Sequence, residues 1–249
     1  MSESDVHPNR ESLPFTDRAD ALDTVGEVIA SGSTRFTAQC PRPLLHRPPV
    51  FGAFVRIFSG TPAALSTAPV VPPQTYDPFA DPAPRTNGEL PAGIPDNTLY
   101  AVVFSAGTGS AEPGRRPTAY GLNEDDLRRQ QPQIFDLLAT EFSALHVGFA
   151  RNGRFRAGIP PRPGRLHSAV SACTPDEVIA ITDAPEFLRS LVTATSDIPT
   201  DELIVACVRQ AYESRAGDYP SLVRMGKQLA SLLRNDPDRL TALLARLEP

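Results

Sequence analysis

Arginines are the residues of this chain whose spacing most clearly suggests a binding site. A guanidinium group forms paired hydrogen bonds with a phosphate or a carboxylate, so clustered arginines suit an anionic ligand or an acidic surface. Five of them fall within fifteen residues: Arg151, Arg154, Arg156, Arg162 and Arg165. If these side chains converge, they can contact phosphates or an acidic partner protein. The alternative interpretation is a solvated, charged surface.

One cysteine and one histidine are close enough in sequence to suggest nucleophilic catalysis. Cys173 follows His167 by six residues, and a cysteine becomes a nucleophile when a neighbouring histidine accepts its proton. The alternative is that all three widely spaced cysteines are small buried apolar residues, as free cysteines often are; they are Cys40, Cys173 and Cys207. No CxxC pair is present, so the spacing predicts no zinc site.

Other catalytic signatures are missing from the sequence. The phosphate-binding loop of P-loop nucleoside triphosphatases needs a lysine after a Gly-rich turn, but the single lysine, Lys227, has no such turn before it. Three pairs of neighbouring carboxylates fall where helices are predicted to begin, and the positive end of the helix dipole explains them; they are Asp125-Asp126, Asp176-Glu177 and Asp201-Glu202. We therefore expect a non-catalytic protein without a cofactor. An unrecognised enzyme that uses Cys173 with His167, or a carboxylate, is the alternative.

Charge and composition limit the class of protein further. The net charge of −5 disfavours a dedicated nucleic-acid-binding protein, in which a strongly basic domain is expected. No stretch approaches the roughly 20 apolar residues that span a bilayer, and the N-terminus lacks the apolar core of a signal peptide. We therefore expect a cytoplasmic protein. Residues 1–22 are predicted to be disordered, and residues 60–97, which hold nine of the 27 prolines, to be a mobile insertion.

Strand patterns dominate residues 23–170. Apolar and polar residues alternate from Arg35 to Cys40, which predicts one face in a core and one in water. The nearly continuous apolar run after Val50 predicts a strand covered on both faces. Asn152-Gly153 is a strong signal for a hairpin turn. The segments expected to form strands are residues 24–30, 34–40, 50–58, 98–105, 145–151 and 154–159.

A pair of helices is predicted within this β region. Asn123 is a favourable N-cap, and Pro132 can begin a second helix. The four-residue spacing of Ile134, Leu138 and Phe142 predicts the buried stripe of that second helix. Residues 107–109 (Gly-Thr-Gly) are expected to form a turn after the fourth strand.

Residues 171–249 are predicted to form a bundle of short helices. Thr174, Pro175 and Glu177 have the spacing of a capping box. Further helices are expected to start at Asp183, Thr200, Asp218 and Asp236. The sequence therefore predicts an α+β protein: a small N-terminal antiparallel β-barrel of about six strands with an inserted helix pair, followed by a helical domain.

Several short segments of the β region resemble the HAS barrel. This is the small barrel at the N-terminus of HerA-type DNA translocases and of the catalytic-head subunits of ATP synthase. The segments that carry the resemblance are Gly26–Ile29, Ser31–Thr34, Ala38–Cys40, Gly52–Val55 and Tyr100–Val103. From about Thr24 to Leu247 the chain also resembles a group of uncharacterised cyanobacterial proteins with a HAS barrel. Its 23 arginines and single lysine indicate a GC-rich genome and hence a bacterial origin. Ala101 departs from the glycine that such barrels often have there.

The resemblance implies a function in assembly. In the HAS-barrel family the barrel joins subunits into a ring and contacts neighbouring proteins, while a separate ATPase domain is catalytic. The resemblance therefore implies an adaptor or assembly module that binds a partner protein, with a ring ATPase as one class of partner. The alternative is a nucleic-acid-associated accessory of a HerA-type translocase and nuclease system, in which the arginines from Arg151 to Arg165 contact phosphates.

Overall fold

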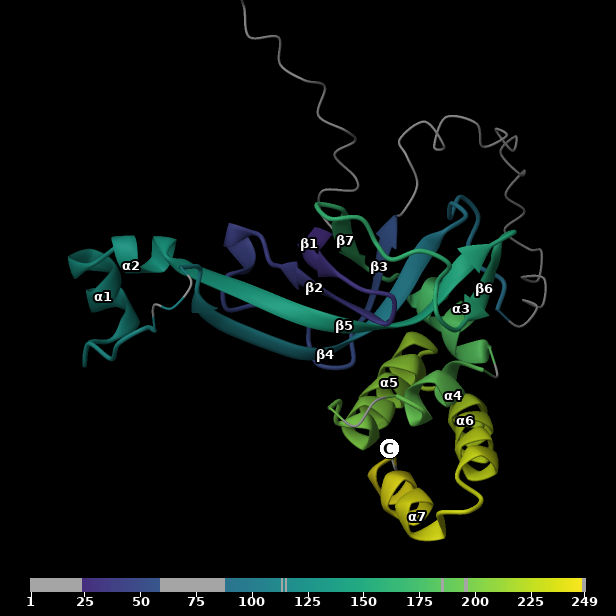
Figure 1. Ribbon diagram of the computed structural model, residues 1–249. Coiled ribbons are helices and arrows are strands. Elements are labelled where there is room, and N and C mark those ends of the chain that lie inside the picture. The colour runs from purple at the N-terminus through teal and green to yellow at the C-terminus, as the bar shows by residue number, and fades with distance from the viewer. Residues whose placement is uncertain are drawn as a thin grey trace, which may run out of the picture.

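Seven strands form one antiparallel sheet in the computed structural model, and six of them close into a barrel (Figure 1). The structure describes residues 24–58 and 88–247, except 113, 115, 185, 195 and 196. The tail predicted at residues 1–22 and most of the insertion predicted at 60–97 therefore lie outside the described residues. The strands are β1 (Thr24–Ser31), β2 (Arg35–Gln39), β3 (Phe54–Phe58), β4 (Thr98–Ser110), β5 (Leu138–Arg151), β6 (Arg154–Ala157) and β7 (Ala169–Ala172).

Pairing of β2 with β5 closes the barrel. The strands follow the order β2-β1-β7-β3-β4-β5-β6. The long strand β5 pairs with β2 through Glu141–Leu145 and with β6 through Gly148–Arg151, so β6 extends the sheet beyond the ring. The predicted barrel of about six strands is confirmed. Strand β7 was not predicted, because its four residues (Ala-Val-Ser-Ala) are too few to show a period.

Alternate residues of the central strands are buried in two different apolar cores. Val55, Ile57 and Leu99 point into the barrel, where they pack with Val28, Phe36 and other inward-facing side chains. Phe54, Tyr100 and Val102 point outward and pack against the helices. The cover predicted on both faces of the third strand is therefore confirmed. The helices occupy the outward face of β3 and of the segments of β4 and β5 around Tyr100, Val102 and Val147, so this part of the barrel surface is not free for docking.

Beyond the barrel, β4 and β5 continue as a two-stranded ribbon that carries α1 (Glu124–Gln130) and α2 (Gln133–Asp136) at its tip (Figure 1). The predicted N-cap at Asn123 is confirmed, since its side chain accepts a hydrogen bond from the Asp126 N–H. The turn predicted at residues 107–109 is wrong, because these residues pair with Ala139–Glu141 and continue β4.

The helical stripe predicted after Pro132 is also wrong beyond Asp136. Leu138 and Phe142 belong to β5. A four-residue spacing fits a strand period of two as well as it fits a helix. Pairing with β4 on one side and β2 on the other selects the strand here.

Five helices follow the barrel, and their apolar core includes outward-facing side chains of β3, β4, β5 and β6. They are α3 (Pro175–Asp183), α4 (Phe187–Val192), α5 (Thr200–Ser214), α6 (Tyr219–Leu232) and α7 (Pro237–Arg246). The predicted caps at Thr174, Asp218 and Asp236 are confirmed, because each side chain accepts a hydrogen bond from the backbone N–H three residues later. The start predicted at Asp183 is displaced to Phe187. Among the described residues, every helix is too short or too polar to traverse a lipid bilayer.

The two predicted domains share structure at their boundary. Strand β7 crosses the boundary drawn between residues 170 and 171, and the helices share a core with the outward face of the barrel. The division into two domains stays a prediction. Residues 88–97, the end of the predicted insertion, lie along the β5–β6 hairpin: Phe155 N–H donates to the Gly88 carbonyl (2.8 Å) and Leu90 N–H to the Gly153 carbonyl (3.0 Å).

Alanine substitutions at two glycines test the close approach of β5 to β6. In Gly148→Ala the new methyl group would lie 2.4 Å from the Arg156 carbonyl oxygen and from the Phe155 ring. We expect the free energy of unfolding to fall by about 1–3 kcal/mol, measured by urea denaturation, because the overpacked core must shift. Gly109→Ala is the matched control, since no described atom lies within 4 Å of its added methyl group. Equal stability of the two variants would contradict this packing.

Candidate functional site

Three of the five predicted arginines lie on one face of the β5–β6 hairpin. Arg151 and Arg154 are directly opposite each other, and Arg156 is opposite Phe149. Side chains of opposed residues share a face of a sheet, as do those of residues two apart. The intervening Phe155 points the other way, into the core beneath the helices. Arg151, Arg154 and Arg156 therefore share the face that continues the inside of the barrel.

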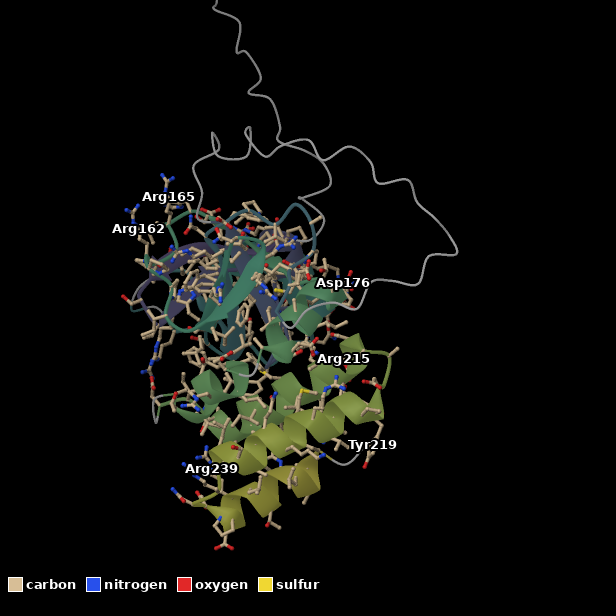
Figure 2. The ribbon with its side chains drawn as sticks, turned by 90° about the vertical axis from the view of Figure 1, so that its right-hand side faces the viewer. Arg162, Arg165, Asp176, Arg215, Tyr219 and Arg239 are labelled. Atoms are coloured by element: carbon tan, nitrogen blue, oxygen red, sulfur yellow. The ribbon has the colours of Figure 1, made fainter. Side chains whose placement is uncertain are left out.

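The other two arginines lie on the loop that follows β6 and covers this end of the barrel. Gly164, in the middle of that loop, lies against Ile57 and Leu99, which face the barrel interior. Since Leu99 pairs with Phe149, the loop lies over the same inner face as the hairpin arginines. Figure 2 shows Arg162 and Arg165 beside each other, pointing outward from the barrel and away from the helices. We call the five arginines and this loop the basic barrel end.

All five side chains of the basic barrel end are exposed. In the part of the chain that the structure describes, none of them forms an ion pair or a side-chain hydrogen bond, whereas Arg35, Arg215 and Arg239 each pair with a carboxylate. Two apolar residues of the loop are also exposed, Ile159 by 62% and Leu166 by 57%. The surface thus combines unpaired guanidinium groups with exposed apolar side chains.

The predicted cysteine and histidine are not brought together. The Cys173 N–H bonds to the Phe54 carbonyl and the His167 N–H to the Val28 carbonyl, so the two residues flank opposite ends of β7. The His167 ring is exposed, with Nδ1 lying 2.6 Å from Oε1 of Glu27. Burial and the Glu177 carboxylate raise the pKa of the Cys173 thiol well above its usual range. This geometry provides no base for a thiolate nucleophile.

The most buried charged group belongs to α3 and not to a reactive site. Glu177 is fully buried and forms an ion pair with Arg56 of β3, with 2.5 Å between Oε2 and the guanidinium nitrogen. Its other oxygen accepts a hydrogen bond from the Tyr100 hydroxyl at 3.1 Å. It also completes the capping box with Thr174, whose N–H donates to Glu177 at 2.8 Å. Both oxygens of this carboxylate therefore have structural partners.

The electrostatics of this buried network follow from that geometry. Burial alone would lower the pKa of Arg56, but the hydrogen bond and negative charge of Glu177 raise it overall, so the guanidinium stays charged. Burial and the same carboxylate raise the pKa of Tyr100, so its hydroxyl stays protonated and donates. Sequence reasoning identified Glu177 only as a helix cap. The signal that it missed is Arg56, a lone charge inside the apolar run of β3.

The other predicted carboxylate pairs also have structural partners. At the start of α1, the Asp126 carboxylate accepts a hydrogen bond from the side-chain amide of Asn123. Asp201 bonds to Arg239, and Glu202 forms an ion pair with Arg246, so both join α5 to α7. Both carboxylate pairs lie in the first turn of a helix, as predicted: Asp125-Asp126 in α1 and Asp201-Glu202 in α5. Among the described residues there is also no group of three or more His, Cys, Asp or Glu side chains that could hold a metal ion.

His146 is buried inside the barrel, where its ring lies 5.5 Å from that of Phe36. The ring lies near the Gly32 backbone, but neither nitrogen reaches hydrogen-bonding geometry with a described residue. Burial lowers the pKa of His146 to about 4. The histidine is therefore neutral in the folded protein at neutral pH.

Comparison with known proteins leaves the family open. No family model matches the chain, and no curated protein matches it either. No family is therefore shown for this chain, and the resemblance to HAS barrels stays a prediction from the sequence.

The buried ion pair generates one prediction. Glu177→Ala leaves the Arg56 guanidinium charged and unpaired in an apolar setting, so we expect the free energy of unfolding to fall by about 3–5 kcal/mol in urea denaturation. Asp136→Ala is the control, because its ion pair with Arg42 is largely exposed and should be worth about 0–1 kcal/mol. Adding Arg56→Met to Glu177→Ala should recover part of the loss. Equal effects of the two single variants would refute the structural importance of the buried pair.

His146 generates a second prediction, for stability against pH. Its folded-state pKa of about 4 lies below the ordinary 6.5, so the unfolded chain binds a proton first as the pH falls. We expect the free energy of unfolding to decrease by about 3 kcal/mol between pH 6.5 and 4 from this group alone. In His146→Leu the decrease over that range should be correspondingly smaller. Parallel pH profiles of variant and wild type would exclude the buried neutral histidine.

Proposed function

We propose that this protein is a non-catalytic adaptor whose basic barrel end binds an acidic surface of a partner protein. The observation that carries the proposal is the set of five exposed arginines at one end of the barrel, without ion pairs among the described residues. Guanidinium groups that have no carboxylate partner among the described residues are available to carboxylates of another chain.

Exposed apolar side chains between the arginines favour a protein partner. Ile159 and Leu166 belong to the same loop as Arg162 and Arg165 and are more than half exposed. Protein–protein interfaces combine a desolvated apolar centre with arginine, which is enriched in them. A surface that binds only phosphates gains little from such apolar side chains.

The loop is held firmly enough to present these side chains in a fixed arrangement. Its Ser168 carbonyl accepts from the Val28 N–H at 3.0 Å, and its His167 N–H donates to the Val28 carbonyl at 2.9 Å. Gly164 packs against the interior of the barrel. A binding loop that is already ordered loses less conformational entropy when the partner binds.

The resemblance to HAS barrels suggests the class of partner. In that family the barrel contacts neighbouring subunits of a ring, so a ring ATPase is the partner we propose first. An adaptor that binds such a ring in trans would act in assembly or recruitment. This step depends on the resemblance, whereas binding to an acidic protein surface depends on the arginines.

Nucleic acid is the second candidate ligand, favoured by the same arginines. Such binding should weaken steeply with salt, because each neutralised phosphate releases counterions. An electrophoretic shift with short DNA and RNA duplexes at 20 and 200 mM salt distinguishes the candidates. A shift at low salt that disappears in the Arg162→Glu/Arg165→Glu variant would favour nucleic acid over an acidic protein.

Charge reversal at the loop tests the adaptor proposal. In Arg162→Glu/Arg165→Glu, repulsion from an acidic partner should reduce its crosslinked recovery from native-level pull-downs by at least about tenfold. The matched control is Arg224→Glu/Arg234→Glu, which makes the same charge change at exposed positions of the helical part. Mass spectrometry of the crosslinked partners gives the measurement. Failure of the wild type to crosslink any partner, or equal loss in both variants, would overturn the proposal.

A further inference from the structure

Among the described residues, one edge of strand β4 has no pairing strand where the ribbon leaves the barrel. On that side β3 pairs with β4 only through Thr98–Val102, and the last bonds join Val103 to Gly52 and Ala53. From Ser105 to Ser110 no other strand of the described chain lies beside β4, as the ribbon in Figure 1 shows. A free strand edge offers backbone donors and acceptors to another extended chain.

The hydrogen-bond pattern identifies the backbone groups at this edge. Ala111 N–H donates to the Leu137 carbonyl (2.7 Å), so residues two and four positions earlier in β4 also bond to β5. The Cys40 N–H donates to the Thr140 carbonyl (2.8 Å), which confirms that Thr140 faces β2 and its neighbours face β4. The N–H and C=O groups of Ala106, Thr108 and Ser110 therefore point away from β5 and toward the open edge.

Natural proteins usually protect such an edge, and this one lacks the usual devices. Charged side chains, proline or a bulge along an edge strand prevent another strand from pairing. The bulge in β4 lies at Val103–Ser105, before the open segment. Residues 105–110 (Ser-Ala-Gly-Thr-Gly-Ser) carry no charge and no proline, so the edge is open to strand addition.

A hollow of about 380 Å³ lies over the same segment. It forms because Gly107 and Gly109 have no side chains on the face where Thr37 and Ser143 make a 3.1 Å hydroxyl contact. A methyl group on either glycine would meet no described atom within 4 Å, so their strand conformation does not require glycine. Large side chains on a neighbouring strand can cover such glycines.

A negative charge beside the hollow favours a basic side chain in the partner. Glu141 lies directly opposite Gly107, is exposed, and is the one charged residue among those that line the hollow. A basic side chain from a strand added beside β4 can reach this carboxylate across Gly107, since no side chain intervenes.

We propose that the open edge of β4 binds an extended segment of a partner protein by strand addition. The segment would place a large side chain over Gly107 and Gly109 and a lysine or arginine toward Glu141. This inference goes beyond the proposed function, because it concerns a different surface from the basic barrel end and different chemistry in the partner.

A second copy of this chain fits the edge less well. Antiparallel pairing of two β4 edges would place Gly107 beside a glycine or another small residue of the other copy. The hollow would then stay empty on both sides. A segment of a different protein with a bulky side chain would fill the hollow, so we propose a partner segment as the occupant.

Peptide binding tests the proposal in the full chain. The probe is the blocked, fluorescently labelled heptapeptide Thr-Val-Tyr-Val-Lys-Val-Thr, in which Tyr and Lys share one face. Two further peptides replace Lys by Glu or Tyr by Gly. Fluorescence anisotropy should show the first peptide binding at least about tenfold more tightly than the other two, since a mispaired charge or an unfilled hollow weakens association.

Variants at one position separate backbone pairing from side-chain effects. Thr108→Pro removes an N–H that faces the open edge and should weaken peptide binding at least about tenfold. Thr108→Val also loses the 2.8 Å hydroxyl contact with Thr140 but keeps the N–H, so its binding should stay within about twofold of wild type. Glu141→Lys should reverse the preference between the Lys and Glu peptides, and it leaves the backbone edge intact.

Two outcomes would overturn the proposal. One is no binding of any of the three peptides at about 1 mM, together with native thermal melting of the protein. The other is a dimer in analytical ultracentrifugation that Thr108→Pro converts to monomer, which would assign the edge to a second copy. Neither outcome affects the arginine-dependent pull-down, so the two proposals fail separately.

Discussion

The ion pair between Arg56 and Glu177 joins the barrel to its helices at one polar point within an apolar contact. A buried charge is tolerated only when it is paired and hydrogen-bonded, so the pair fixes how α3 lies on β3 and β4. Sliding the helix by one turn would separate the charges and would also break the bond from Tyr100. Apolar packing supplies most of the attraction between the two parts, while this network selects one arrangement of them.

That arrangement determines which surfaces are left for binding. The helices cover the outward face of the central strands, and the barrel interior is filled by side chains such as Phe36, Ile57 and Phe142. The loop over one end of the barrel and the ribbon that extends from it belong to neither core, so both surfaces are left available for contact with other molecules. The loop is basic, and its long arginine side chains reach outward. The ribbon is uncharged along its edge and offers backbone groups.

The sequence predicted the parts of the fold that local chemistry controls. Capping residues such as Thr174 and Asp218 define helix starts through bonds within one turn, and Asn152-Gly153 defines its hairpin through backbone preference alone. Predictions from the sequence failed where contacts with residues distant in sequence determine the secondary structure. Phe142 has neighbours spaced as in a helix, yet pairing with β2 and β4 makes it part of a strand. The arginines were found from their spacing, but the pairing of Arg56 with Glu177 spans 121 positions and leaves no local pattern.

The glycines of the ribbon show why such failures are informative. Gly107 and Gly109 weaken a strand, because glycine loses more backbone entropy than other residues and contributes no side-chain contact. Their backbone does not adopt the left-handed conformation that would demand glycine, and an added methyl group would meet no described atom. Folding alone therefore gives no reason to prefer glycine at either position. A strand that keeps residues unfavourable to its own stability is best explained by what must approach it, and at this edge that is another extended backbone with larger side chains.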